Sequence, residues 1–276
     1  RPVSDAAARV DIAAAWGVSS LPTETGRSSS EIIAALGAGD LDAVVVGGVD
    51  IHDLPAQREA AIALKKAFVV SLEIAPSAVT ELADVVLPVA AVTEKSGSFL
   101  NWEGRARSFD AAVTDSLNRS DVRILSALSD AMGNPIALPS VTSSAREFAQ
   151  LGSWEGARAS FAPIAPGSVP SVSGNEFVLT SWRRLLDMGT LQRGEDNLAG
   201  TRRPTVAVIS PKRASELGVA TGEQLRISNA HGSTTIPALV EDIHDDAVWI
   251  PRNSFGSQAL ISLDAVHGSV VTVVKA

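Results

Sequence analysis

The sequence contains no cysteine among its 276 residues, and this absence removes several kinds of chemistry at once. Without a thiol, the chain forms no disulfide, offers no thiolate to a metal and holds no cysteine-ligated iron–sulfur cluster. Long apolar runs are missing as well, since no stretch approaches the roughly 18 to 20 residues that a helix needs to cross a bilayer. We therefore expect a soluble chain without direct insertion into a membrane.

Basic residues are fewer than acidic residues in this sequence. The 23 lysines and arginines face 31 aspartates and glutamates, which gives a formal net charge of -8 at pH 7. A surface of this sign repels nucleic acid and anionic membranes, although a local basic patch remains compatible with it. We therefore expect no nucleic acid among the partners of this chain.

The usual motifs of catalysis and metal binding are also missing. The four histidines lack the HxxxH or HExxH spacing that places two metal ligands on one helical face. Serine is abundant but never occurs as GxSxG, the motif of an exposed nucleophile. An acidic cluster of Asp242, Asp245 and Asp246 favours solvated turn residues over a cation site. The sequence accordingly predicts no catalytic residue and no metal site.

The first half of the chain alternates predicted helices with short apolar strands. Strands are expected at residues 41–46, 68–72 and 85–87, and helices at residues 6–16, 29–36, 57–67, 78–82 and 120–132. Two Ser-x-x-Glu capping boxes, Ser28 with Glu31 and Ser144 with Glu147, predict helix starts. Strands that alternate with helices indicate parallel βαβ units, and valine-rich runs such as residues 41–46 are typical of strands covered on both faces.

The second half has mainly the periodicity of strands. They are expected at residues 177–182, 205–209, 224–228, 234–240, 247–250 and 269–274. One helix is clearly delimited, with Ser210 as N-cap, Pro211 in its first position and Gly218 at its end. This pattern predicts a small β-barrel. We therefore predict an α/β domain over residues 1–152, a Pro- and Ser-rich linker over residues 153–174 and a barrel over residues 175–276.

Two segments after predicted strands carry polar residues of possible functional use. Residues 83–105, ADVVLPVAAVTEKSGSFLNWEGR, lead from a strand through a proline into a polar run. By residue type alone, ligand binding and a role in holding a long loop together are equally favoured there. Gly47-Gly48-Val49-Asp50 follows another strand, but it lacks the GxGxxG spacing, and a tight turn is the favoured interpretation.

Residues 83–105 resemble the signature of the molybdopterin-dinucleotide oxidoreductases, in which a strand ADVVLP leads into E-K-x-G-T-x-x-N-x-E-G-R. Ser98 stands in place of the threonine, and the matching residues are Glu94, Lys95, Gly97, Asn101, Glu103, Gly104 and Arg105. Residues 209–227, ISPKRASELGVATGEQLRI, are similar to the pattern N-P-x-D-A-x-x-L-G-I-x-D-G-D-x-V-x-V of that family's dinucleotide-binding domain. The resemblance covers about residues 42–276. It implies a Rossmann-like parallel-sheet domain followed by a six-stranded double-psi barrel.

The sequence departs from this family's pattern at several positions that resemble cofactor contacts. Asp50 replaces an asparagine, residues 77–79 replace a Thr-Glu-Thr-like run, and Asp187 with Met188 replaces a histidine or aromatic residue before Gly189. A carboxylate beside a pyrophosphate is disfavoured by like-charge repulsion. In family members, the cluster domain and the molybdenum ligand lie upstream of the matched regions, so this chain alone is expected not to catalyse a redox reaction.

The alanine- and valine-rich style and the V-W-I-P-x-N-S segment resemble one branch of the family, the large iron–sulfur subunit of actinobacterial-type NADH:quinone oxidoreductase, respiratory complex I. The chain begins with Arg1, as expected for a piece of a longer polypeptide. The resemblance implies a cofactor-free scaffold, iron–sulfur clusters upstream, and the other peripheral-arm subunits of complex I as partners. It implies a cytoplasmic location on the inner face of the plasma membrane. Glu94, Asn101 and Arg105 are then expected to hold the loop and the interdomain groove together.

Two alternatives remain open at this point. In a working molybdenum enzyme such as a formate dehydrogenase or nitrate reductase, a molybdopterin guanine dinucleotide site would be lined by Gly47, Glu94, Ser98, Asn101, Arg105, Thr190 and Asn253. The other alternative is a free-standing nucleotide-binding module.

Overall fold

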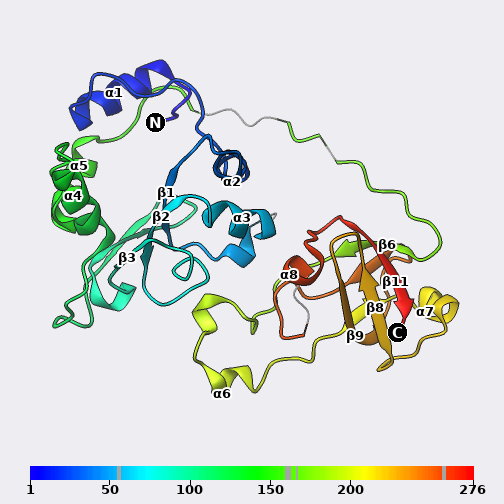
Figure 1. Ribbon diagram of the computed structural model, residues 1–276. Coiled ribbons are helices and arrows are strands. Elements are labelled where there is room, and N and C mark those ends of the chain that lie inside the picture. Colours follow the sequence, from blue (N-terminus) through cyan, green and yellow to red (C-terminus); the bar gives the residue numbers. More distant parts are fainter. Residues whose placement is uncertain (55–56, 159–162, 166, 257–258) are drawn as a thin grey trace. The chain divides into compact units, whose positions relative to one another are not determined.

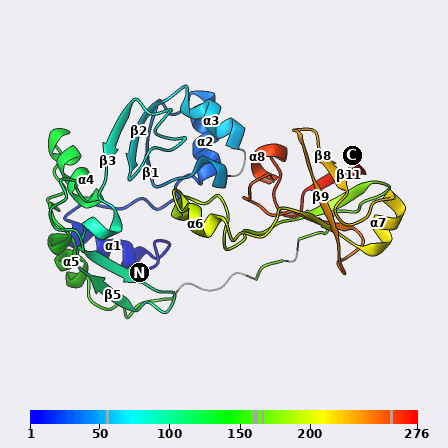
Figure 2. The same cartoon turned by 90° about the horizontal axis from the view of Figure 1, so that it is seen from below.

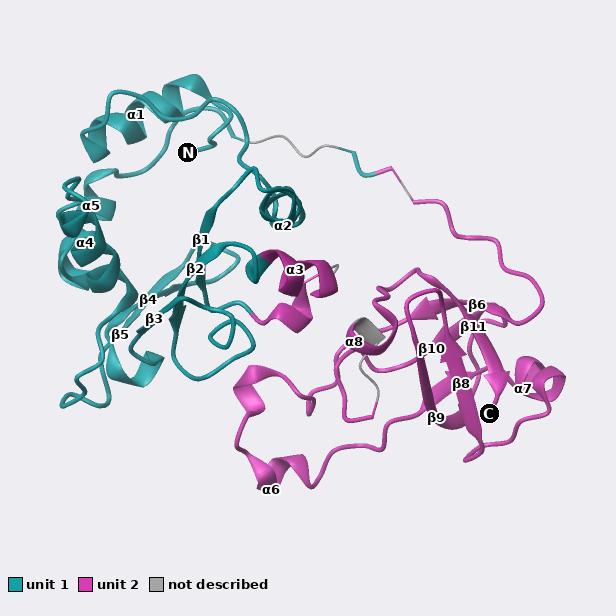
Figure 3. Cartoon of the chain, in the orientation of Figure 1, with its two compact units in different colours: residues 1–49, 64–164 teal, residues 50–63, 165–276 magenta. Residues whose placement is uncertain are grey.

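A computed structural model describes residues 1–54, 57–158, 163–165, 167–256 and 259–276 (Figure 1). The chain forms two compact units, Arg1–Val49 with Leu64–Ile164 and Asp50–Ala63 with Ala165–Ala276 (Figure 3). The predicted linker includes residues 159–162 and Pro166, which lie outside the described residues. Within the described parts of the chain, every helix is too short or too polar to span a bilayer.

The first unit is built on a three-stranded parallel sheet with the order β1-β2-β3. These strands are β1 (Ala43–Gly47), β2 (Phe68–Glu73) and β3 (Val85–Pro88). Val45 pairs with Val70, and Leu72 pairs with Leu87. The predicted parallel α/β arrangement is therefore confirmed.

The helices of this unit are mostly where the sequence placed them. They are α1 (Ala6–Trp16), α2 (Ser29–Ala38), α4 (Asp121–Ala131) and α5 (Val141–Gln150). Ile124 of α4 packs with Leu72 and Val89 in a small buried cluster. The expectation that β1 is covered on both faces is wrong, because β1 is an edge strand whose burial alternates along its length and leaves Val45 59% exposed.

Local hydrogen bonds decide where helices begin in this unit. The capping box of α2 is confirmed, with the Ser28 N–H donating to Glu31 Oε2 at 2.6 Å. The predicted box at Ser144 is wrong, because α5 is capped one turn earlier by Ser140, whose Oγ accepts the N–H of Ser143. No helix forms at residues 78–82. There, Ser77 and Thr80 accept each other's backbone N–H groups as in a capping box, and the Glu81 N–H bonds the Ser77 carbonyl at 3.1 Å, but the chain continues only as a turn.

The polar run after β3 contains a β-hairpin that the sequence did not predict. It follows a short 3-10 turn, η2 (Val92–Glu94), and consists of β4 (Gly97–Leu100) and β5 (Ala106–Phe109). The rings of Phe99 and Phe109 stack across this antiparallel pair with centroids 4.9 Å apart. Strand β5 of this hairpin is labelled in Figure 2.

The second unit contains a closed barrel with the strand order β10-β6-β11-β8-β9-β7 (Figures 1 and 2). Its strands are β6 (Glu176–Thr180), β7 (Ala207–Ile209), β8 (Gln224–Ser228), β9 (Ser233–Val240), β10 (Ala247–Trp249) and β11 (Val270–Lys275). Two neighbouring pairs are parallel, β6 with β10 and β7 with β9, and the other four are antiparallel.

The pairing pattern has an internal twofold symmetry. Exchanging β6, β7 and β8 with β9, β10 and β11 reproduces the same barrel order, and each parallel pair falls on the other parallel pair. The two helices that follow the middle strands of the halves, α7 (Pro211–Leu217) and α8 (Ala259–Leu263), also correspond. This is the arrangement expected of a double-psi barrel, and the predicted six-stranded barrel is confirmed.

Apolar side chains fill the barrel. Phe177, Leu225, Ile227 and Val273 are fully buried in one cluster, which also includes Ala214 of α7. Ser210 caps α7 and Gly218 ends it in the left-handed conformation, both as predicted. The further elements of this unit are η1 (Ile51–Asp53), the predicted helix α3 (Gln57–Leu64, of which Leu64 belongs to the first unit), η3 (Thr190–Gln192) and α6 (Asp196–Ala199).

Candidate functional site

Glu94 connects two loops of the first unit. Its Oε2 accepts the backbone N–H of Ala91 at 2.8 Å, and its Oε1 accepts the Ser116 hydroxyl at 2.7 Å. The Asn118 amide donates to both carboxylate oxygens at 3.1 Å. The Ala91 N–H, followed by Ser116 and Asn118, holds the pKa of Glu94 below its ordinary value, because all three donate to the charged form. The acceptor capacity of this carboxylate is therefore used within the protein.

Asn101 and Arg105 lie in the turn of the β4–β5 hairpin. Asn101 Oδ1 accepts the backbone N–H groups of Glu103 at 3.0 Å and of Arg105 at 2.9 Å, which defines the turn. The side chain of Arg105 is 65% exposed and its Nε lies 3.1 Å from Glu103. Ser98 is exposed on β4, opposite Ser108. Asn101 thus holds the loop through the backbone, whereas Arg105 forms a surface ion pair.

Other residues of the same signature have structural partners in this unit. Asp84 accepts the N–H of Val69 at 2.7 Å and so fixes the start of β3 against β2. Lys95 bonds Asp121 in the first turn of α4 at 2.6 Å. A Cβ on Gly97 would lie 2.9 Å from the ring of Phe109, so a larger residue would disturb the stacked hairpin. These positions have structural roles without any ligand.

Gly47 ends β1 and leads into a tight turn. Gly48 has φ 62 and donates its N–H to the Leu72 carbonyl at 3.3 Å, which explains the glycine by its backbone conformation. Asp50 accepts the His52 N–H at 3.0 Å and caps η1. Among the described residues, no hydrogen bond or ion pair joins Gly47, Glu94 and Ser98 to one another.

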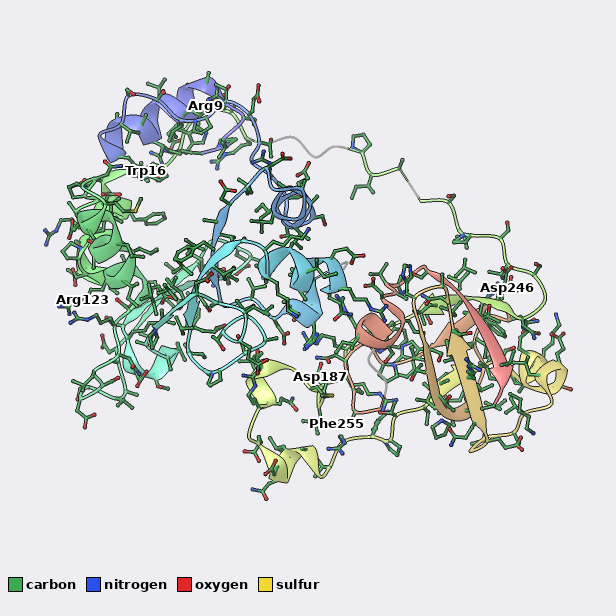
Figure 4. The ribbon with its side chains drawn as sticks, in the orientation of Figure 1. Arg9, Trp16, Arg123, Asp187, Asp246 and Phe255 are labelled. Atoms are coloured by element: carbon green, nitrogen blue, oxygen red, sulfur yellow. The ribbon has the colours of Figure 1, made fainter. Side chains whose placement is uncertain are left out.

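The loop after β6 in the second unit contains Asp187, which is labelled in Figure 4. This loop is closed by an arginine between two carboxylates. Arg183 Nε lies 2.7 Å from Asp187, and its Nη1 lies 3.1 Å from Asp53. The Asp187 side chain is only 7% exposed, and its Oδ1 also accepts the Gly189 N–H at 2.7 Å. The hydrogen bond to Asp187 is the main cause that raises the pKa of Arg183. The charge of Arg183 is therefore balanced by two carboxylates of the same unit.

Thr190 and Asn253 lie in this same region. Thr190 begins η3 just after Gly189, and the backbone carbonyl of Asn253 accepts the Met188 N–H at 2.9 Å. A Cβ on Gly189 would lie 2.6 Å from Arg183 Nη2 and 2.8 Å from Asp187, so a larger residue would displace these two side chains. Two of the seven predicted cofactor contacts, Thr190 and Asn253, thus lie in two loops that this backbone hydrogen bond joins.

The Arg183 ion-pair cluster was only partly visible in the sequence. Asp187 attracted notice as a departure from the family pattern. Its four-residue spacing from Arg183 indicates an ion pair only within a helix, and residues 181–189 form no helix. Asp53 lies 130 residues before Arg183, so no local signal links them. The cluster includes Asp187, a carboxylate that replaces a histidine or aromatic residue of the family pattern. Because it already balances the arginine, an added phosphate group would meet repulsion from both acids.

Each half of the chain matches a family model. Residues 4–131 match the family model of molybdopterin oxidoreductase, and residues 177–272 match that of the molydopterin dinucleotide binding domain. The structure of acetylene hydratase from Pelobacter acetylenicus shares the fold, with a TM-score of 0.58 and 15% identity over 90% of this chain and 46% of that chain. The resemblance to molybdopterin oxidoreductases is thereby confirmed.

Some curated relatives are similar over nearly the whole of this chain. The chain is 44% identical to the G subunit of NADH-quinone oxidoreductase from Mycobacterium bovis and 43% identical to that from Streptomyces coelicolor, in each case over 99% of this chain. It spans about a third of the length of these relatives, 34% and 33% respectively. The resemblance to this kind of subunit, indicated by the motifs, is confirmed.

Two further relatives are similar over about half of the chain. The nitrate reductase of Symbiobacterium thermophilum is 33% identical over 48% of this chain, and formate dehydrogenase H of Escherichia coli is 33% identical over 49%. Within the described residues, no group of three or more histidines, aspartates or glutamates is placed to hold a metal ion.

Proposed function

We propose that this chain is the C-terminal portion of the G subunit of an NADH-quinone oxidoreductase, where it serves as a scaffold. In this proposal, iron–sulfur clusters upstream in the full-length protein pass electrons from NADH. The other peripheral-arm subunits of the complex are its partners, and the complex holds it at the cytoplasmic face of the membrane. The 44% identity over nearly the whole chain supports the assignment to this kind of subunit.

One observation carries the scaffold part of the proposal. The loop that resembles the family's cofactor loop is closed by Arg183 between Asp187 and Asp53, at 2.7 and 3.1 Å. A dinucleotide would bring pyrophosphate charge to a loop whose cation is already paired with two carboxylates. Glu94 in the first unit likewise accepts hydrogen bonds from Ala91, Ser116 and Asn118. The charged groups at these positions are thus paired within the protein.

Metal and nucleotide analysis of the full-length protein tests the scaffold role. Protein purified from cells grown with added molybdate is assayed for molybdenum and iron by mass spectrometry, and acid extracts are assayed for guanine nucleotide. We expect iron without stoichiometric molybdenum or guanine nucleotide. Stoichiometric molybdenum together with bound guanine nucleotide would show that the chain is the cofactor-binding half of a molybdenum enzyme.

Variants at the loop test the same role in the assembled enzyme. Replacing Arg183 by methionine leaves Asp187 without its ion-pair partner, so we expect less assembled complex on native gels and correspondingly less NADH-quinone activity. The matched control, Arg226→Met, alters an exposed arginine of β8 and should leave assembly unchanged. Normal assembly of the Arg183 variant with lost activity per complex would contradict a purely structural role.

A further inference from the structure

A pocket of about 880 Å³ lies in the second unit, against the barrel strands β7, β9 and β10. Val208, Leu239 and Ile243 contribute apolar surface to its lining. Trp182 and Trp249 also line it, with ring centroids 4.9 Å apart. Walls of this kind favour an apolar side chain, because contact with them removes apolar surface from water.

Two arginines that line this pocket, Arg184 and Arg203, form no ion pair with a described residue. Arg184 Nη1 donates to the carbonyls of Arg203 at 3.2 Å and Pro204 at 2.6 Å, which holds the guanidinium in place. Among the described residues, no carboxylate forms an ion pair with Arg184 or Arg203, and no hydrogen bond uses the Nε–Nη2 edge of Arg184. Burial, followed by the charge of Arg203, lowers the pKa of Arg184, so an anion here would relieve repulsion.

The unused edge of Arg184 has the geometry that binds a carboxylate with two parallel hydrogen bonds. Only one lining residue among those described carries a carboxylate, the exposed Glu241. Trp249 is 7% exposed, and its ring is already packed by Trp182 and, at 5.1 Å, by Arg184. Trp182 is 60% exposed and leaves an aromatic surface at the pocket. Together with Val208 and Leu239, this surface suits an aliphatic or aromatic side chain of a peptide.

We propose that this pocket docks an acidic peptide segment of a partner protein. One apolar side chain of the segment fills the space between Trp182 and the strand residues Val208 and Leu239, and flanking carboxylates pair with Arg184 and Arg203. The inference goes beyond the proposed function, because it concerns binding by the chain on its own. A failure of the subunit assignment would leave this binding unchanged, and the reverse also holds.

The test uses the 276-residue chain and a fluorescein-labelled synthetic peptide in which aspartates and glutamates flank a central Leu-Phe pair. Fluorescence anisotropy should show saturable binding, and replacing the acids by their amides or Leu-Phe by Gly-Gly should weaken it at least about tenfold. Arg184→Gln and Arg203→Gln should each weaken it about tenfold. The control Arg226→Gln, an exposed arginine on β8 outside the pocket, should bind as the unmodified chain does.

Three results would overturn the proposal. They are the absence of saturable binding, equal binding of the acidic and amide peptides, and unchanged binding by Arg203→Gln. Displacement of the peptide by guanosine monophosphate with Arg184-dependent affinity would show a nucleotide site instead. Arg184→Gln also removes the bonds to two backbone carbonyls, so its melting curve must be compared with that of Arg203→Gln, whose side chain makes no described hydrogen bond.

Discussion

Asn101 and Arg105 occupy the same hairpin turn but contribute to it by different physical means. The amide oxygen of Asn101 accepts two backbone N–H groups, whereas the guanidinium of Arg105 faces solvent beside Glu103. Backbone donors left without an acceptor raise the free energy of the turn, while an exposed ion pair is screened by water and salt. Of the two side chains, Asn101 is therefore expected to stabilise the turn more than Arg105.

Replacing Asn101 by alanine should lower the free energy of unfolding by about 1 kcal/mol, because two backbone N–H groups lose their acceptor. Arg105→Ala should lower it by less than about 0.5 kcal/mol, since only an exposed ion pair is lost. Urea titrations followed by circular dichroism measure both values. A larger loss for Arg105→Ala than for Asn101→Ala would show that the arginine has contacts beyond Glu103.

Glu94 gives the first unit a pH-dependent stability. Hydrogen bonds from Ala91, Ser116 and Asn118 lower the folded pKa of Glu94 below its ordinary value of 4.5, so its contribution is present above that pH. It is lost as the pH falls through the folded pKa. Glu94→Gln should thus be less stable than the unmodified chain at pH 7, and the difference should shrink toward pH 3.5.

Urea midpoints at pH 7 and pH 3.5 measure this difference, with the exposed Glu24→Gln as control. The control should behave as the unmodified chain does at both pH values. A difference for Glu94→Gln that grows as the pH falls would contradict the assigned direction of the pKa shift.

At the scale of elements, helix caps are where the sequence and the structure agree most closely. Ser28 caps α2 at an exposed site, and Ser210 caps the buried start of α7, where its hydroxyl also donates to Asp245 at 2.7 Å. Ser210 is 2% exposed. Its bond is the main cause that lowers the pKa of Asp245. We therefore expect the Ser210 cap to contribute more to the free energy of unfolding than the Ser28 cap.

Ser210→Ala should lower the free energy of unfolding by about 1 to 2 kcal/mol, because the Arg213 N–H loses its acceptor and Asp245 loses its donor. Ser28→Ala, the matched control, should cost only about 0.5 to 1 kcal/mol, since water replaces the lost bond. Thermal unfolding followed by circular dichroism ranks the two variants. Equal losses would show that the Ser210–Asp245 bond adds nothing to the cap.

At the scale of the whole molecule, the chain has separate cores. Leu72 packs with Val89 and Ile124 in the first unit, and Ile227 lies in the large buried cluster of the barrel. Apolar burial is the main favourable term in folding, and each cluster is formed by residues of one unit only. The two units are therefore expected to unfold in separate steps.

Calorimetry of the 276-residue chain should resolve two transitions. Ile227→Ala should lower only one of them and Leu72→Ala only the other, because each leaves a cavity in one core at a cost of about 2 to 5 kcal/mol. A single transition that both variants shift equally would contradict the independence of the two units.

The sequence could predict much of the fold but only part of the candidate site. The alternation of helices with strands, the barrel and the caps at Ser28 and Ser210 were predicted, since they depend on neighbours within a few residues. The hairpin of β4 and β5 was missed because Asn101, Trp102 and Glu103 resemble a polar loop, although Asn101 folds it into a turn. The cap at Ser140 was missed because its partner three residues on is Ser143, and not the glutamate or glutamine of the usual capping box.

Local spacing thus determined, from the sequence alone, the family resemblance, the α/β region and the barrel that follows it. The tertiary structure decided how the loop after β6 is satisfied, because Asp53 and Arg183 are 130 residues apart and meet only in the folded second unit. It also placed Arg184 and Arg203 together at an apolar pocket. Charge pairing over such separations depends on the path of the folded chain, which no short pattern of residues records.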